Sequence, residues 1–405
     1  ALVDLINVLI INVFSALATG GAVVCAQSIG AQELDRADRA ANQLMYIVTA
    51  AALIIMALSL VLCRPLLGLL FGQVEPAVME GAVTYFIISA LSYPFIALYN
   101  AGAALFRAMG NSKVSMTISI VMNCINIGGN ALFIFGFDMG AAGAALATLI
   151  SRIVGAVFIL VLLRRSTNII HIDSYLRLGL HPGMIKNILE IGIPNGLENG
   201  MFQLGKIIVQ GMIASYGTAA IAANAVCNSI AGFPIIPGSA IGLALITVVG
   251  QCVGAQRYEE AKQYIHKLTG LAYLFMFFFN ALIAIFCSQI VGFFSLSAEA
   301  TDTAVQIMLW HSLFCAVFWP AAFTMPNGLR AANDVRFTMT VSILSMWICR
   351  ICMSYILGTV LGMGALGTWF AMFLDWIVRI VFFAVRLHSN KWQHRELQQK
   401  MAAVD

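Results

Sequence analysis

The sequence predicts an all-α integral membrane protein in which two helical bundles repeat in parallel. Hydrophobic residues make up 61% of its 405 residues and charged residues only 10%, whereas soluble globular domains carry about 25% charged residues. The apolar residues form long blocks such as 46–63 and 341–361. A segment that crosses lipid must satisfy its own backbone, so it is a helix or part of a closed barrel. The blocks lack the alternation of barrel strands, and we therefore predict helices.

The apolar blocks and the turn and charge signals between them predict eleven membrane spans. The predicted spans are approximately residues 1–31, 43–66, 78–107, 114–137, 140–164, 187–216, 219–252, 266–294, 302–328, 337–361 and 363–387. In membrane proteins, Lys and Arg are enriched in the short loops that face the cytoplasm. Arg152, Lys206, Arg350 and Arg379 lie inside spans; of the rest, all fall in the loops and span ends of one side except Arg64, which falls on the other. This charge distribution predicts a cytoplasmic C-terminus and an outer position for residue 1.

An internal repeat links the two halves of the chain at an offset of 223–224 residues. Its matching blocks are Gln27–Gln32 with Gln251–Gln256, Arg107-Ala108 and 116–120 with Arg330-Ala331 and 339–343, and Gly140–Gly143 with Gly364–Gly367. In this register the span 187–216 would map before residue 1. We therefore expect five helices in the first bundle and six in the second, with the first helix of an intact 6 + 6 arrangement missing. Six is an even number, so the two bundles are expected to be parallel.

The longest polar interval, 166–186, separates the two halves. We predict an N-lobe of five helices at 1–165, a cytoplasmic connector at 166–186, a C-lobe of six helices at 187–387 and a cytoplasmic tail at 388–405.

Five sequence blocks together resemble the multidrug and toxic-compound extrusion (MATE) family, in the right order along essentially the whole chain. They are Leu105–Lys113 (LFRAMGNSK), Gly140–Thr148 (GAAGAALAT), Gly192–Asn199 (GIPNGLEN), Gly250–Ala255 (GQCVGA) and Asp375–Arg379 (DWIVR). The resemblance implies a V-shaped pair of six-helix lobes with alternating access. Such proteins export small, often cationic compounds in exchange for Na⁺ or H⁺, without another cofactor. We expect a monomer in the cytoplasmic membrane of a prokaryote, with a small-molecule substrate and lipid as partners and no nucleic acid.

The acidic positions of that family are only partly present in this chain. The aspartate on the family's first helix has no counterpart here. Some members add an aspartate on the fifth helix, where this sequence has Asn130, with Asn126 one turn before it. Another branch pairs a glutamate on the seventh helix with an acid on the tenth. Here Glu198 lies on the matching helix, and 302–328 has no acid beyond Asp302. The sequence therefore leaves the coupling ion open.

Ionisable residues at bilayer depth are costly and are functional candidates for that reason. Glu198 and Lys206 bracket the centre of the span 187–216. Glu198, with Asn195 three positions before it, is the expected coupling carboxylate and the one position where we expect Na⁺ to bind. Alternatively, Glu198 is a structural carboxylate neutralised by Lys206 or Arg350.

The remaining candidates lie in the last spans. Asp375 and Arg379 are four residues apart, a spacing that favours an ion pair on one helix face. We expect Arg350 to be the partner of Glu198 or Asp375, or else a contact for an anionic substrate. His311 is expected to be a hydrogen-bonded structural residue, and a proton shuttle is the alternative.

Two other functions compete with the exporter. A lipid-linked oligosaccharide flippase of the same superfamily would use arginines such as Arg350 and Arg379 on a pyrophosphate. An intramembrane enzyme would need a catalytic motif, and the sequence contains no HExxH and no GxSxG. Cys349 and Cys352 form a CxxC without further ligands nearby in the sequence, so we expect no metal site there.

Overall fold

The computed structural model describes residues 2–71, 75–172, 179–389 and 391–393, and every element in these ranges is a helix. Parts of the expected connector and tail, namely 173–178, 390 and 394–405, lie outside the described residues. Arg177, Arg395 and Lys400 of the charge distribution lie there too. The predicted lobe boundaries and the sides of the membrane remain predictions.

The chain divides into two compact units, which we call unit 1 (Ala1–Gly196) and unit 2 (from Leu197 onward). Unit 1 contains α1 (Leu2–Gly30), α2 (Leu34–Val61), α3 (Cys63–Phe71), α4 (Pro76–Leu91), α5 (Tyr93–Ala108), α6 (Ser112–Asn130), the π-helix η1 (Ala131–Gly136), α7 (Gly140–Leu163) and the first part of α8 (Pro182–Ala214). Unit 2 contains the rest of α8, α9 (Thr218–Gly254), α10 (Tyr258–Ile285), α11 (Cys287–Gly292), α12 (Ala298–Trp319), the π-helix η2 (Pro320–Thr324), α13 (Pro326–Ala331), α14 (Val335–Ser345), the π-helices η3 (Met346–Cys352) and η4 (Tyr355–Val360), α15 (Gly364–His388) and the 3₁₀ turn η5 (Lys391–Gln393).

Within the described ranges, eight helices are long and apolar enough to cross a membrane, or nine if the bent pair α4–α5 is one span. The sequence predicts eleven. The two predicted spans outside this set are α8 and α15, which are long helices with charged residues in their interiors, Glu198 and Lys206 in α8 and Asp375 and Arg379 in α15. The protein is thus an all-α membrane protein, and these two long helices carry several of the candidate functional residues, namely Asn195, Glu198, Lys206, Asp375 and Arg379.

The repeat seen in the sequence is also present in the backbone. The helices α2 and α10 begin and end 224 positions apart, and so do the π-helices η1 and η4. Left-handed residues recur with the same offset, as at Gln32 (φ 63°) and Gln256 (φ 60°). The order of helices and turns described in unit 1 therefore recurs in unit 2, with η4 in the place of η1, whereas η2 and η3 have no π-helical counterpart among the described residues of unit 1.

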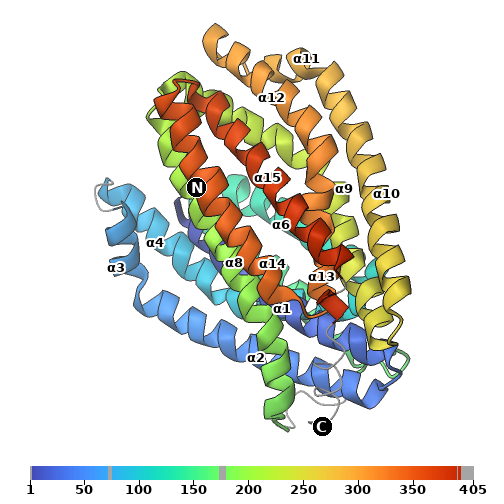
Figure 1. The fold of residues 1–405 in the computed structure, drawn as a ribbon. Helices are drawn as coiled ribbons and strands as arrows, with labels where there is room; N and C mark the ends of the chain where they lie inside the picture. Colours follow the sequence, from blue (N-terminus) through green and yellow to red (C-terminus); the bar gives the residue numbers. More distant parts are fainter. Residues whose placement is uncertain (1, 72–74, 173–178, 390, 394–405) are drawn as a thin grey trace. The chain divides into compact units, whose positions relative to one another are not determined.

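Each unit has its own packing pattern. In unit 1, α1 packs on α2 and α5, and α6 packs on α7. In unit 2, α9, α10 and α12 pack on one another, and Figure 1 shows them as neighbouring helices in yellow-green, yellow and orange. On α10, Leu274, Phe277 and Ile285 are each at least 65% exposed. An apolar surface of that kind is suited to lipid.

A glycine in each unit lets a long helix approach a π-helix closely. A Cβ at Gly367 of α15 would lie 2.7 Å from the backbone nitrogen of Gly358 in η4. At the equivalent position in α7, a Cβ at Gly143 would lie 2.9 Å from the Cβ of Phe133 in η1. The two repeated Gly-Ala-X-Gly blocks therefore end on a glycine because no larger residue fits there.

We expect Gly143→Ala and Gly367→Ala to lower the stability of the protein by about 1–3 kcal/mol, the usual cost of overpacking. Thermal unfolding of the detergent-purified variants would measure the change as a lower Tm. Gly128→Ala and Gly270→Ala are the controls, because a Cβ at either position meets no atom within 4 Å. A Tm for Gly367→Ala equal to that of Gly270→Ala would contradict this account of the close contact.

Candidate functional site

Glu198 is buried in unit 2 and forms an ion pair with Arg330 of α13. The Nη2 of Arg330 donates to Oε1 of Glu198 at 2.6 Å, and Nη1 of Arg330 donates to Oδ1 of Asn327 at 2.7 Å. The second carboxylate oxygen, Oε2, is buried without a hydrogen-bond partner among the described residues. The expectation that Lys206 or Arg350 would neutralise Glu198 is wrong. Arg330 lies 132 positions away in sequence, and only the tertiary fold brings the two together.

Asp375 and Arg379 form a buried ion pair on α15. The Nε of Arg379 donates to Oδ1 of Asp375 at 2.9 Å, and Nη2 of Arg379 donates to the backbone oxygen of Ser342 at 3.1 Å. The guanidinium also lies 5.0 Å from the ring centroid of Phe323 and 5.7 Å from that of Phe202, close enough for cation–π attraction. This pair joins α15 to α14 and is surrounded by aromatic rings.

Arg350 and Lys206 have no acidic partner within the part of the chain that the structure describes. Arg350, in η3, has its guanidinium 5.4 Å from the ring centroid of Phe202, and its buried Nε has no hydrogen bond. The expectation that Arg350 is an ion-pair partner of Glu198 or Asp375 is wrong. Asp375 attracts Arg350 electrostatically, but its short contact is with Arg379 on the same helix.

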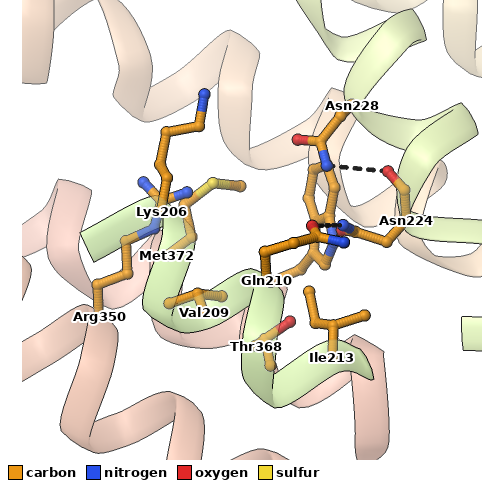
Figure 2. A pocket seen from close by; sticks show the side chains of 10 residues that line it. Lys206, Val209, Gln210, Ile213, Asn224, Asn228, Arg350, Thr368 and Met372 are labelled. Carbon is orange, nitrogen blue, oxygen red and sulfur yellow. Dashed lines mark hydrogen bonds between the residues drawn. The ribbon is translucent and has the colours of Figure 1, made fainter. Parts of the chain in front are cut away.

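Lys206 and Arg350 line a partly open pocket of unit 2 that holds about 390 Å³, including the space at its mouth. Its lining residues come from α8, α9, η3 and α15; they are Lys206, Val209, Gln210, Ile213, Asn224, Asn228, Arg350, Thr368, Trp369 and Met372. Figure 2 shows the two cationic side chains on one side of this pocket and the amide side chains on the other. The lining contains no carboxylate.

The amide side of the pocket is held by hydrogen bonds centred on Asn224. Its Nδ2 donates to Oε1 of Gln210 at 2.7 Å, and its Oδ1 accepts a bond of 3.1 Å from the indole nitrogen of Trp369. The Nδ2 of Asn228 donates to the backbone oxygen of Asn224 at 2.9 Å. Asn224 thus links α8, α9 and α15 behind the pocket.

His311 lies outside this pocket, in an aromatic cluster of unit 2. Its side chain is 1% exposed, and its ring centroid is 5.3 Å from that of Trp369 and 5.9 Å from that of Trp376. Its Nδ1 has no hydrogen-bond partner in the described chain. A histidine enclosed by rings in this way is poorly placed to exchange protons with water.

The two candidate residues of the α6 helix in unit 1, Asn126 and Asn130, form a short chain of side-chain hydrogen bonds. The Nδ2 of Asn130 donates to Oδ1 of Asn126 at 3.1 Å, and Nδ2 of Asn126 donates to the hydroxyl of Thr148 at 3.1 Å. Asn195 is buried near the end of unit 1, one turn before Glu198 on α8. Among the described residues, no group of three or more His, Cys, Asp or Glu side chains is arranged to hold a metal ion.

Sequence reasoning missed the amide side of the pocket and the pairing of Arg330. A signal for the pocket was present, because Gln210 follows Lys206 by four residues and Asn228 follows Asn224 by four. Such a spacing places two polar side chains on one face of an otherwise apolar helix. Arg152 of unit 1 was also left aside, and its Nη1 donates to the hydroxyl of Ser92 at 2.6 Å.

The comparison with protein families agrees with this architecture. The MatE family pattern matches residues 1–132 and 194–356, which is well over half of the chain. The chain belongs to the MatE family.

Among the relatives of this MatE protein, the uncharacterized transporter YisQ of Bacillus subtilis is 27% identical over 95% of this chain and 84% of its own length. The probable multidrug resistance protein NorM of Thermotoga maritima is 25% identical over 95% of this chain and 82% of its own.

Solved structures share the fold of this MatE protein. A MATE protein in its bent conformation matches with a TM-score of 0.87 at 19% identity, over 100% of this chain and 87% of that one. An outward-facing multidrug resistance MATE family transporter matches with a TM-score of 0.87 at 19% identity, over 99% of this chain and 86% of that one.

We expect Arg379→Met to destabilise this MatE protein by about 3–5 kcal/mol, because it leaves the buried Asp375 carboxylate without its partner. The double variant Asp375→Leu/Arg379→Met removes both charges and should recover most of the loss. The thermal unfolding of wild type, the single variant and the double variant is compared to measure these changes in stability. A double variant no more stable than Arg379→Met would show that the pair contributes through some other contact.

Proposed function

We propose that this protein is a secondary transporter that exports small organic molecules by alternating access, in exchange for Na⁺ or H⁺. The observation that carries the proposal is the pocket of unit 2, which places polar and charged side chains beside apolar ones within membrane helices. Membership in the MatE family and the names of the NorM relatives support the same function. We further propose that the protein works as a monomer, surrounded by lipid, in the cytoplasmic membrane of a prokaryote, with its C-terminus in the cytoplasm.

The coupling site proposed here is the pair of Glu198 and Arg330. Glu198 binds Arg330 through Oε1 alone, so the unpartnered Oε2 is the position for a proton or a Na⁺ ion. An ion bound at Oε2 would reduce the negative charge that holds Arg330. The contact between α8 and α13 would then weaken, which makes the conformation of unit 2 dependent on the bound ion. A conformational change of this kind requires the ion to bind one state more tightly than the other.

The flippase alternative is less favoured, because one of the two arginines that it would use is already occupied. Arg379 is bound by Asp375 at 2.9 Å, whereas Arg350 has no acidic partner among the described residues.

Transport by the purified protein in liposomes tests the proposal directly. Na⁺ and pH gradients are imposed separately, and the movement of small fluorescent organic ions of either charge is followed. Gradient-driven movement of at least one ion supports export by exchange. If the probes move no faster through liposomes with folded protein than through protein-free liposomes under every gradient, the proposal is refuted.

We expect Glu198→Gln to reduce gradient-driven transport by about tenfold or more, the scale of a typical coupling free energy between two sites. The glutamine carbonyl still accepts a hydrogen bond from Arg330, so the fold should be retained, whereas the charge that binds the ion is lost. The matched control is Glu190→Gln, an exposed acid two turns earlier on α8. If the folded Glu198→Gln protein transports like wild type with the same ion dependence, Glu198 has a structural role and does not couple transport to the ion.

A further inference from the structure

We propose that the pocket of unit 2 binds an organic anion, a compact apolar or aromatic body that carries one carboxylate, sulfonate or phosphate group. The inference rests on the proposed transport function and names the charge of its substrate. It differs from the cationic substrates that the family resemblance implies.

The balance of charge in unit 2 is the first support. Its buried acids are already engaged by arginines, Glu198 by Arg330, Asp375 by Arg379 and Asp334 by Arg386. Lys206 and Arg350 line the pocket without such a partner among the described residues, and they repel each other. Two like charges that face one pocket are stabilised by an anion placed between them.

The charged hydrogen-bonding groups that remain free in the pocket are donors, whereas its free acceptors, Oδ1 of Asn228 and the hydroxyl oxygen of Thr368, are neutral. Gln210 uses its Oε1 to accept from Asn224, which leaves its amide nitrogen available. The indole nitrogen of Trp369 is already bound to Asn224. The ammonium group of Lys206, the guanidinium of Arg350 and the amide of Gln210 are therefore open to a ligand, and all three donate. Charge-assisted bonds from such donors to an oxyanion are short and strong.

The apolar part of the lining defines the rest of the ligand. Val209, Ile213 and Met372 are buried, and Trp369 is only 6% exposed at the back of the pocket. These groups suit an apolar ring rather than a sugar or a peptide backbone. The ligand is thus an amphipathic anion, with its charged end toward Lys206 and Arg350.

The repeat shows that this positive charge is particular to unit 2. Arg350 stands 224 positions after Asn126, and the equivalent site of unit 1 carries a neutral amide bonded to Thr148. The shared helical framework therefore does not require a cation at this position, which is consistent with a role in binding.

The test compares two probes that share one ring and differ in charge, 1-naphthoate and 1-naphthylmethylammonium. Their binding to the full chain in phosphatidylcholine nanodiscs is followed by naphthalene fluorescence. We expect 1-naphthoate to bind about tenfold more tightly or better, the scale of hydrogen bonds to charged groups. Equal affinity, or preference for the ammonium probe, would overturn the proposal without any variant being made.

Two variants locate the binding. Lys206→Gln and Arg350→Gln should each weaken 1-naphthoate about tenfold and reduce the preference over the cation. Neither should lower the Tm, because each removes a charge without an acidic partner. The controls are Lys186→Gln and Arg336→Gln, exposed cations on α8 and α14, which should leave the affinity unchanged. Unchanged affinity in both pocket variants would overturn the assignment.

Two further outcomes separate this inference from its alternatives. If phosphatidylglycerol in the nanodisc abolishes naphthoate binding, the pocket binds a lipid headgroup and the proposal of a free organic anion is overturned. If naphthoate binds as expected but no gradient moves it in liposomes, the anion site stands and the transport function fails. If a gradient moves only organic cations, transport stands and the anion site fails.

Discussion

The cost of placing a charge among apolar helices governs how this protein is built. A buried carboxylate or guanidinium needs an opposite charge and hydrogen bonds within the protein. Asp375 meets this need on its own helix, whereas Glu198 and Asp334 meet it through arginines of other helices, Arg330 and Arg386. Ion pairs of this kind fix which helix faces meet, because a shift of one turn would leave both partners unpaired. Lys206 and Arg350, which have no acidic partner in the described part of the chain, depart from this rule, and both line the pocket.

The π-helical segments explain how the pocket side chains reach their positions. Arg350 lies in η3, which is followed after two residues by η4, where α15 approaches the backbone through Gly367. That contact sets α15 against the segment that carries Arg350, and α15 supplies Thr368 and Trp369 to the lining. A π-helix widens the helical turn and shifts the direction of the following side chains, and such segments occur often at functional sites. The close contact at Gly367 therefore lies on the π-helix that follows the one carrying Arg350.

The sequence predicts the helices and their repeat well because both follow from local patterns. Apolar blocks of sufficient length locate most of the helices, and the blocks ending at Gln32 and Gln256 correspond to turns with nearly equal φ. The pairing of charges was harder to predict. The pair Asp375–Arg379 is local and follows from helical spacing, but Glu198 and Arg330 meet only through tertiary packing. The same holds for Trp369 and Asn224, 145 positions apart. The sequence alone shows which charges are costly, and the fold decides which of them are left without a partner.

The equivalence of Asn126 and Arg350 has a consequence for how such a protein changes over time. The two side chains occupy equivalent positions of the repeat, Asn126 in the α-helix α6 shortly before η1, and Arg350 in the π-helix η3 shortly before η4. A single substitution at one of them alters the polarity of that half and leaves the supporting helices as they are. A duplicated bundle can in this way carry two chemically different interiors on one architecture. Selection on the cargo can then act through a few positions, while the packing glycines and the ion pairs stay under separate selection for folding.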